Sequence, residues 1–150
     1  MKINWNRVIT IITFFAFILI PQISPAEDNI RQFAEKYMQA QKNAWENGDF
    51  ELLETLEDPD VAFHNINGNV TVGLEAHKKY IQEYRKGPGG KAQLHQEWKY
   101  LMGEANMFSL SSKWTWTFQD LKMTTDRLMV GRIRNGKLVE EWGATQVPSK

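Results

Sequence analysis

Few side chains in this sequence can transfer a proton near neutral pH. The chain has three histidines, His64, His77 and His95, and it has no cysteine. An imidazole titrates close to pH 7, so a histidine in a pocket can act as a general acid or a general base without a large shift of its pKa. The lack of cysteine excludes disulfides, thiol catalysis and thiolate metal ligands.

The three histidines differ in their sequence surroundings. His64 ends the apolar stretch 61–65, "VAFHN", whose alternation predicts that His64 points to the face opposite Phe63 unless the strand end twists. A rim histidine that is hydrogen-bonded or exposed is therefore the alternative to a catalytic one. His77 lies on the apolar line of a helix, where a satisfied interior histidine is the alternative. His95 alternates with polar neighbours and is predicted to face solvent.

Carboxylates offer weaker candidates. Asp126 shares strand parity with Leu128 and could direct its carboxylate into a cavity, although a surface aspartate beside Arg127 is the alternative. Of Glu140 and Glu141, one is predicted to face inward. The sequence has no nucleophile elbow, phosphate loop or dinucleotide fingerprint, and its histidines lack metal-ligand spacing, so it predicts neither a metal nor a cofactor.

Helical periodicity occupies the first part of the chain. One long helix is predicted between a cap at Asp28 and the stop signal Asn47-Gly48, and a short one from Asp49 to the stop at Asp58-Pro59. A third follows Gly73 and ends at "KGPGG".

Strand periodicity dominates the rest of the chain. A small hairpin is predicted around Asn67-Gly68, and a four-stranded antiparallel meander follows, with Asn135-Gly136 as its last turn. This order predicts an α+β fold in which three helices cover one face of a strongly curved, mostly antiparallel sheet.

Aromatic residues indicate where a pocket could form. Trp114, Trp116 and Phe118 alternate with polar residues and are predicted to face the helices, mostly as core. The remainder of that surface could line a pocket for a flat or hydrophobic small molecule. The residues predicted to line it are Tyr37, Asn65, Trp114, Trp116, Phe118, Met129 and Trp142.

The N-terminus has the layout of a secretory signal. A basic head precedes the apolar run Val8–Ile20, and Ser24 and Ala26 supply the small residues, which predicts cleavage after Ala26 and export to the periplasm or beyond. A retained membrane anchor is the alternative, but the run falls short of the roughly 20 residues of a bilayer span. Residues 27–150 are then one domain, without a membrane segment.

The charge of that domain argues against polyanionic partners. Removal of residues 1–26 takes away two basic residues and no acidic one, which leaves 16 of the 18 basic side chains against 18 acidic ones. No run of Lys and Arg occurs in it. Nucleic acid is therefore not an expected partner.

Four stretches, "NGDFELLETL", "VAFHN", "GLEAHKKYI" and "GRIRNGKLVEEWGATQ", together resemble the SnoaL-like members of the nuclear-transport-factor-2-like superfamily, with its cone-shaped α+β barrel. The resemblance covers residues 30–146. It implies a bent sheet around helices, a pocket at the open end and a homodimer formed through the sheet. Members include polyketide cyclases, ketosteroid isomerases, epoxide hydrolases, dehydratases and binding proteins.

The resemblance does not bring the family's acid/base residues with it. The aspartate of the cyclase-like members falls on Met129, and the general base of the ketosteroid isomerases falls near Asn65. Neither side chain can transfer a proton.

Three functions are consistent with the sequence. The first is an exported domain that binds an apolar or aromatic small molecule without assigned catalysis, with His64 contributing a hydrogen bond. The second is an isomerase, cyclase, lyase or hydrolase that uses His64 or His77 as acid or base. The third is a dimerisation module with a vestigial pocket. A histidine that faces a cavity and is oriented by a carboxylate would favour the enzyme.

Overall fold

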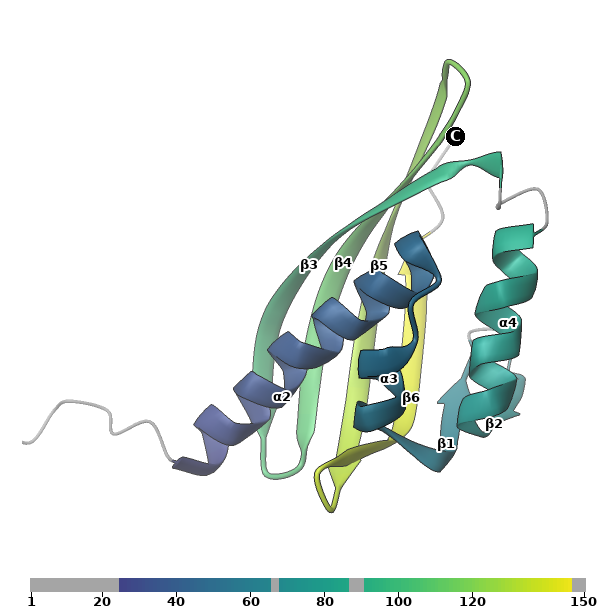
Figure 1. Ribbon diagram of the computed structural model, residues 1–150. Coiled ribbons are helices and arrows are strands. Elements are labelled where there is room, and N and C mark those ends of the chain that lie inside the picture. The colour runs from purple at the N-terminus through teal and green to yellow at the C-terminus, as the bar shows by residue number, and fades with distance from the viewer. Residues whose placement is uncertain (1–24, 66–67, 87–90, 147–150) are drawn as a thin grey trace, which may run out of the picture.

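A long helix lies across the concave face of a curled six-stranded sheet in the computed structural model, which describes residues 25–65, 68–86 and 91–146 (Figure 1). This helix, α2 (Pro25–Lys42), buries the stripe that its periodicity predicts. It begins at Pro25, so the prediction that Asp28 is the cap is wrong. Asp28 lies instead in the first turn, where its negative charge interacts favourably with the positive end of the helix dipole. The buried members of the stripe are Ile30, Ala34, Tyr37 and Ala40.

The end of the first helix and the start of the second follow the sequence signals. The second helix ends at Leu56, so the predicted stop at Asp58-Pro59 is wrong, because these two residues lie in the strand that follows. A π-helical turn, η1 (Asn43–Asn47), continues α2 and ends at Gly48, which has a φ of 75° and donates its N–H to the Ala44 carbonyl. Glycine adopts this left-handed conformation without steric cost. Asp49 then accepts a hydrogen bond from the N–H of Glu51, the first residue of α3 (Glu51–Leu56). The predicted stop at Gly48 is confirmed.

The strands follow in the order that the sequence predicts. They are β1 (Glu57–His64), β2 (Val70–Val72), β3 (Gln93–Glu104), β4 (Met107–Phe118), β5 (Leu121–Arg134) and β6 (Lys137–Gln146), with α4 (Leu74–Lys86) between β2 and β3. The order in the sheet is β2-β1-β6-β5-β4-β3, and β1 runs parallel to β6 while all other neighbours are antiparallel. The predicted meander is β3 to β6.

Some sequence predictions fall outside the described residues. These are residues 1–24 of the predicted signal, Asn67 of the first hairpin turn and Gly87–Gly90 of the "KGPGG" stop. Within the described ranges, none of the helices has the length and apolar composition that crossing a bilayer requires.

One extra residue in β6 changes which side chains face inward. Ile133 pairs with Leu138 and Arg132 pairs with Glu140, which leaves Val139 as a β-bulge. Leu138 and Glu141 are therefore both buried although they are three residues apart. Unbroken alternation would place Glu140 on the same face as Leu138, but the bulge shifts the alternation, and Glu141 is the one of the two glutamates that faces inward.

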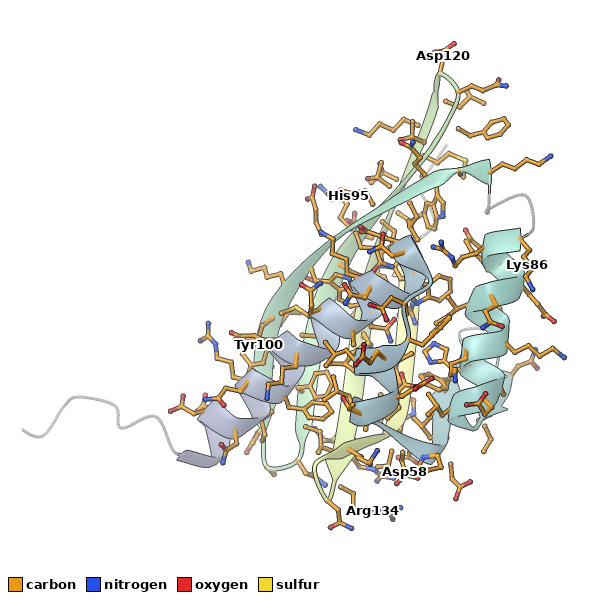
Figure 2. The ribbon with its side chains drawn as sticks, viewed as in Figure 1. Asp58, Lys86, His95, Tyr100, Asp120 and Arg134 are labelled. Carbon is orange, nitrogen blue, oxygen red and sulfur yellow. The ribbon has the colours of Figure 1, made fainter. Side chains whose placement is uncertain are left out.

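The inward face of β4 is only partly covered by helices. Trp114 is buried and packs edge-on against Trp45, with ring centroids 5.0 Å apart. Trp116 is half-buried, but Phe118 is 39% exposed, so the prediction that Phe118 faces the helices is wrong. The cause is the length of the β4–β5 hairpin, which extends past the helices to its tip at Asp120 (Figures 1 and 2).

Candidate functional site

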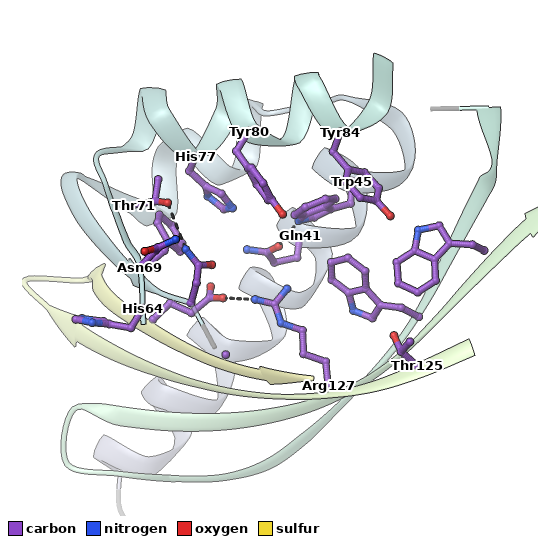
Figure 3. Close-up of a pocket in the computed structure, with 16 residues that line it drawn as sticks. Gln41, Trp45, His64, Asn69, Thr71, His77, Tyr80, Tyr84, Thr125 and Arg127 are labelled. Carbon is purple, nitrogen blue, oxygen red and sulfur yellow. Dashed lines mark hydrogen bonds and ion pairs between the residues drawn. The ribbon is translucent and has the colours of Figure 1, made fainter. Parts of the chain in front are cut away.

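A cavity of about 650 Å³ lies between α4 and the concave face of the sheet (Figure 3). Its volume falls within the range of small-molecule sites. The aromatic part of its lining consists of Trp45, Phe63, Tyr80, Tyr84, Trp114 and Trp116, and its polar part includes Gln41, His77, Thr125, Arg127 and Glu141.

His77 is the titratable imidazole that points toward this cavity (Figure 3). Its place on α4, one turn before the buried Ile81, puts it on the inward side of the helix. The Nδ1 atom lies 3.1 Å from Oε2 of Glu57, and the ring packs on Phe63 with centroids 3.9 Å apart. Glu57, the first residue of β1, is fully buried. A buried carboxylate therefore fixes the orientation of a histidine in the cavity wall.

An ion pair forms a second part of the polar lining. Arg127 on β5 donates from Nη2 to Oε1 of Glu141 on β6, at 2.8 Å. The guanidinium also lies over the ring of Trp114, with its carbon 5.2 Å from the ring centroid. Arg127 is in register with Ser112 of β4, whose side chain is buried. Arg127 is thus the inward residue at this place in β5.

A tyrosine joins the two carboxylates. The hydroxyl oxygen of Tyr37 lies 2.9 Å from Oε1 of Glu57 and 2.9 Å from Oε2 of Glu141, and 2.6 Å from Nε2 of Gln41. The indole N–H of Trp45 donates to Oε1 of Gln41 at 2.9 Å. Because an indole nitrogen only donates, this bond requires the amide oxygen of Gln41 to face Trp45 and its nitrogen to face Tyr37.

This geometry determines how many protons the cluster needs. Tyr37 accepts from Gln41 and has one hydrogen to donate, so it can donate to Glu57 or to Glu141 but not to both. All contacts are satisfied when one of the two acids is protonated and donates to Tyr37, and Tyr37 donates to the other. Glu141 is paired with the Arg127 guanidinium, which favours its charged form, so the proton is assigned to Oε1 of Glu57. Oε2 of Glu57 then accepts from Nδ1 of His77.

The electrostatics of the cluster agree with this arrangement. Burial raises the pKa of Glu57 above its usual value, although the nearby His77 partly opposes the shift. Burial is the main cause that raises the pKa of Tyr37 well above its usual value, followed by the nearby Glu141 and Glu57, so its hydroxyl keeps its hydrogen. With Nδ1 of His77 donating, the free lone pair of the imidazole is on Nε2. The site can thus offer a base to a molecule in the cavity.

His64 does not supply that base. It borders the cavity beside Asn65, but its imidazole points away from it and stacks on Trp142, with ring centroids 5.1 Å apart and 7° between the planes (Figure 3). The alternation of the strand predicts this direction. His95 has a side chain that is 58% exposed, as the sequence predicts.

Several residues predicted for the pocket lie elsewhere. Trp142 is on the convex face with His64, because the bulge at Val139 reverses the alternation. Met129 is buried in the core, and Tyr37 is fully buried behind the cavity wall. Phe118 lies beyond the cavity. The predicted residues that do line it are Asn65, Trp114 and Trp116.

Asp126 is exposed and does not line the cavity. It pairs across the strands with Lys113, on the face of the sheet opposite Arg127. Leu128, which shares its parity, is 45% exposed. The proposal that this parity faces the cavity is wrong, because Leu128 contributes to the convex face and not to the core.

Gln41, Glu57 and Arg127 belong to the site but are not predicted from the sequence, and Glu141 is predicted only as one of two alternatives. One local signal points to Gln41: Tyr37, Gln41 and Trp45 follow at intervals of four and give the buried stripe of α2 and η1 three polar groups. In the described part of the chain, no three His, Asp or Glu side chains gather as metal ligands would.

Comparison with solved structures identifies the fold. A candidate SnoaL-like polyketide cyclase from Jannaschia sp. CCS1 superposes with a TM-score of 0.67 at 12% identity, covering 84% of this chain and 91% of the other. The chain has the SnoaL-like, NTF2-like fold. An LEH-like epoxide hydrolase from M. tuberculosis superposes on this chain with a TM-score of 0.63 at 12% identity, covering 81% of this chain and 86% of the other.

A third similar structure carries no assigned activity. It is an NTF-2 like protein of unknown function from Burkholderia xenovorans LB400, with a TM-score of 0.59 and 20% identity over 85% of this chain and 90% of the other. No family model matches the sequence, and no curated protein matches it. The fold expected from the resemblance is confirmed, and the chemistry depends on the side chains of this chain.

Proposed function

We propose that this SnoaL-like protein is an enzyme that transfers a proton to or from a small, largely apolar or aromatic molecule, with His77 as the acid/base. The observation that carries the proposal is the hydrogen bond between buried Glu57 and His77 in the cavity wall. A carboxyl group that orients an imidazole toward a pocket is a recurring arrangement of general acid/base sites. His77 moves the proton, and Glu57 is its positioning residue.

The proposed reaction begins at a carbon next to a carbonyl group. Nε2 of His77 takes a hydrogen from that carbon as a proton, and the electron pair of the C–H bond moves to the carbonyl oxygen as an enolate. Arg127 is the cation in the cavity lining that can stabilise this negative oxygen. Return of the proton to another carbon is an isomerisation, loss of a leaving group is an elimination, and attack of the enolate on a second carbonyl is a cyclisation.

The walls of the cavity support the choice of substrate class. Trp45, Trp114 and Trp116 present aromatic faces and edges, which favour a flat ring system. The similar structures include a candidate polyketide cyclase and an epoxide hydrolase, both of which share only the fold with this chain. The location is part of the proposal: the signal-like pattern at residues 1–26 supports an enzyme that works outside the cytoplasm, in the periplasm or beyond.

The test uses 2-tetralone, a flat ketone with acidic hydrogens next to its carbonyl group. In D₂O the wild-type protein should exchange these hydrogens for deuterium, which NMR spectroscopy follows directly. His77→Gln removes the imidazole that accepts the proton and should lower the exchange rate by more than about a hundredfold. His95→Gln and His64→Gln are the controls, because neither imidazole points into the cavity. Both should exchange at the wild-type rate.

Binding is measured separately by quenching of tryptophan fluorescence, since Trp45, Trp114 and Trp116 line the cavity. Binding with no exchange above the rate in buffer without protein would contradict the enzyme and leave a binding protein. Equal exchange by wild type and His77→Gln would assign the proton transfer to another group. Exchange lost in His64→Gln but kept in His77→Gln would reverse the assignment of the two histidines.

A further inference from the structure

The concave face of the sheet continues past the cavity into an exposed apolar surface. Two pairs of opposed residues at the end of the β4–β5 hairpin face the same way as Trp114, namely Trp116 with Met123 and Phe118 with Leu121. Phe118, Leu121 and Met123 are 39%, 70% and 65% exposed. We call these three residues the apolar arm. Exposed apolar side chains grouped in this way indicate a binding surface.

The apolar arm is continuous with the cavity. Trp116 and Thr125 both line the cavity. Phe118 follows Trp116 by two residues on β4, and Met123 precedes Thr125 by two on β5, so each lies on the same face about 7 Å further along its strand. A molecule that leaves the cavity between Trp116 and Thr125 therefore meets the apolar arm directly.

The inward residues of β5 form a polarity gradient. From the body of the protein to the hairpin tip they are Arg127, Thr125, Met123 and Leu121. The first is a cation in the cavity, paired with Glu141, and the last two are exposed apolar side chains. This order matches a ligand with a polar head and an apolar tail.

The two faces of the hairpin tip differ in polarity. The convex face is polar: Thr115 pairs with Thr124, and Thr117 pairs with Lys122. The apolar side chains of the tip lie on the face that continues the cavity wall. This continuity indicates the ligand of the cavity as the occupant of the apolar arm, and binding to a membrane is a separate outcome of the test.

We infer that the substrate is elongated, with a polar or aromatic head held in the cavity and an alkyl-type chain of several carbons that lies along the apolar arm. The inference rests on the proposed function for the identity of the site, but it concerns binding alone. It can therefore fail while proton transfer by His77 is confirmed, and the reverse is also possible.

The experiment measures affinity as a function of chain length. A series of 4-n-alkylbenzoates from ethyl to heptyl is titrated into the protein, and the quenching of tryptophan fluorescence gives the affinity of each compound. The matching benzamides are measured as well, so that the result does not depend on the charge of the head. For wild type, each added methylene should tighten binding by about three- to fourfold over the part of the series that reaches the apolar arm. A variant with Phe118→Ser, Leu121→Ser and Met123→Ser should bind the ethyl compounds as wild type does and show little further gain.

The matched control changes Met102, Met107 and Leu128 to Ser, because these residues are also exposed and apolar but lie on the convex face. This variant should keep the wild-type dependence on chain length. Thermal unfolding of both triple variants checks that they are folded. A chain-length dependence that is absent in wild type, or unchanged in the apolar-arm variant, would overturn the inference. A change of sedimentation or of vesicle binding in the apolar-arm variant, with the chain-length dependence intact, would also overturn it in favour of protein or membrane contact.

Discussion

Glu57 lies at the point where three elements meet, and its two oxygens have different partners. Oε2 faces His77 on α4, whereas Oε1 faces Tyr37 on α2. A negative charge on a carboxyl group in such a buried position would cost much free energy of folding. The proton that satisfies the bond to Tyr37 also removes that charge, so the same group meets both the hydrogen-bonding and the electrostatic requirement.

Glu57→Gln tests this proton assignment. The amide can donate to Tyr37 and accept from His77, as the protonated acid does. The pKa of Glu57 is raised in the folded protein, so its contribution to stability is present below the pKa of the unfolded chain and is lost as the pH rises through the folded pKa. Glutamine does not titrate. The free energy of unfolding in urea should therefore be similar for variant and wild type at acidic pH, and higher for the variant at pH 8.

Glu141→Gln is the control for that comparison. It removes the negative partner of Arg127 and should destabilise the protein by about 1–3 kcal/mol near neutral pH. If Glu57→Gln were equally destabilising, with no gain at higher pH, Glu57 would be ionised in the folded protein and the proton assignment would be wrong.

The sequence could predict single residues of this site but not their partners. The inward position of His77 follows from the helical periodicity of its own segment, and that prediction is confirmed. Glu57 and Glu141 are separated by more than half of the chain and meet only because β1 runs parallel to β6. A contact between residues so far apart in the sequence leaves no local pattern from which it could be predicted.

Two glycines on the concave face allow close packing of the strands that carry the site. A methyl group at Gly131 would lie 2.4 Å from an aromatic carbon of Phe108 and 2.9 Å from a methyl carbon of Leu138. One at Gly143 would lie 2.8 Å from Nη2 of Arg127. The first contact is with the closely packed core, whereas the second is with the end of a flexible side chain.

Gly131→Ala should therefore destabilise the protein by about 1–3 kcal/mol, because the core must move to admit the methyl group. Gly143→Ala should cost clearly less, since the guanidinium can shift. Urea unfolding of the two variants side by side measures the difference. Equal losses would mean that the Arg127–Glu141 pair is as rigid as the core, and a larger loss for Gly143→Ala would contradict the prediction.

At this scale the sequence predicts elements better than the faces of strands. Gly48, Asp49 and Asn135-Gly136 are local signals, and each has the role predicted for it. Alternation separates the side chains of β5 into two sets but does not say which set faces inward. Both sets contain apolar residues: Leu128 is on the convex face and Met129 in the core. The alternation therefore leaves both directions open for Asp126, and the structure places it on the surface.

The mature chain should begin at Glu27 if the N-terminal pattern works as a secretory signal. Cleavage after Ala26 would remove the first two residues of α2 and leave Glu27 and Asp28 in its first turn. Expression in a secreting host, followed by intact-mass measurement and N-terminal sequencing of the exported protein, tests this. Exported protein that still begins at Met1 would exclude the signal and favour a retained segment.

The bulge at Val139 decides which side chains of β6 line the cavity, so a change in the bulge can alter the site without any substitution. Glu141 faces inward and Trp142 outward only because one additional residue precedes them in β6. If the bulge lay beyond Trp142 instead, regular alternation from Leu138 would turn the indole toward the cavity and expose the acid that pairs with Arg127. A shift of the bulge along the strand is thus equivalent to several simultaneous substitutions. In the evolution of such a sheet, a change in the position of one bulge could convert a polar site into an apolar one, or back, while the rest of the sequence stays the same.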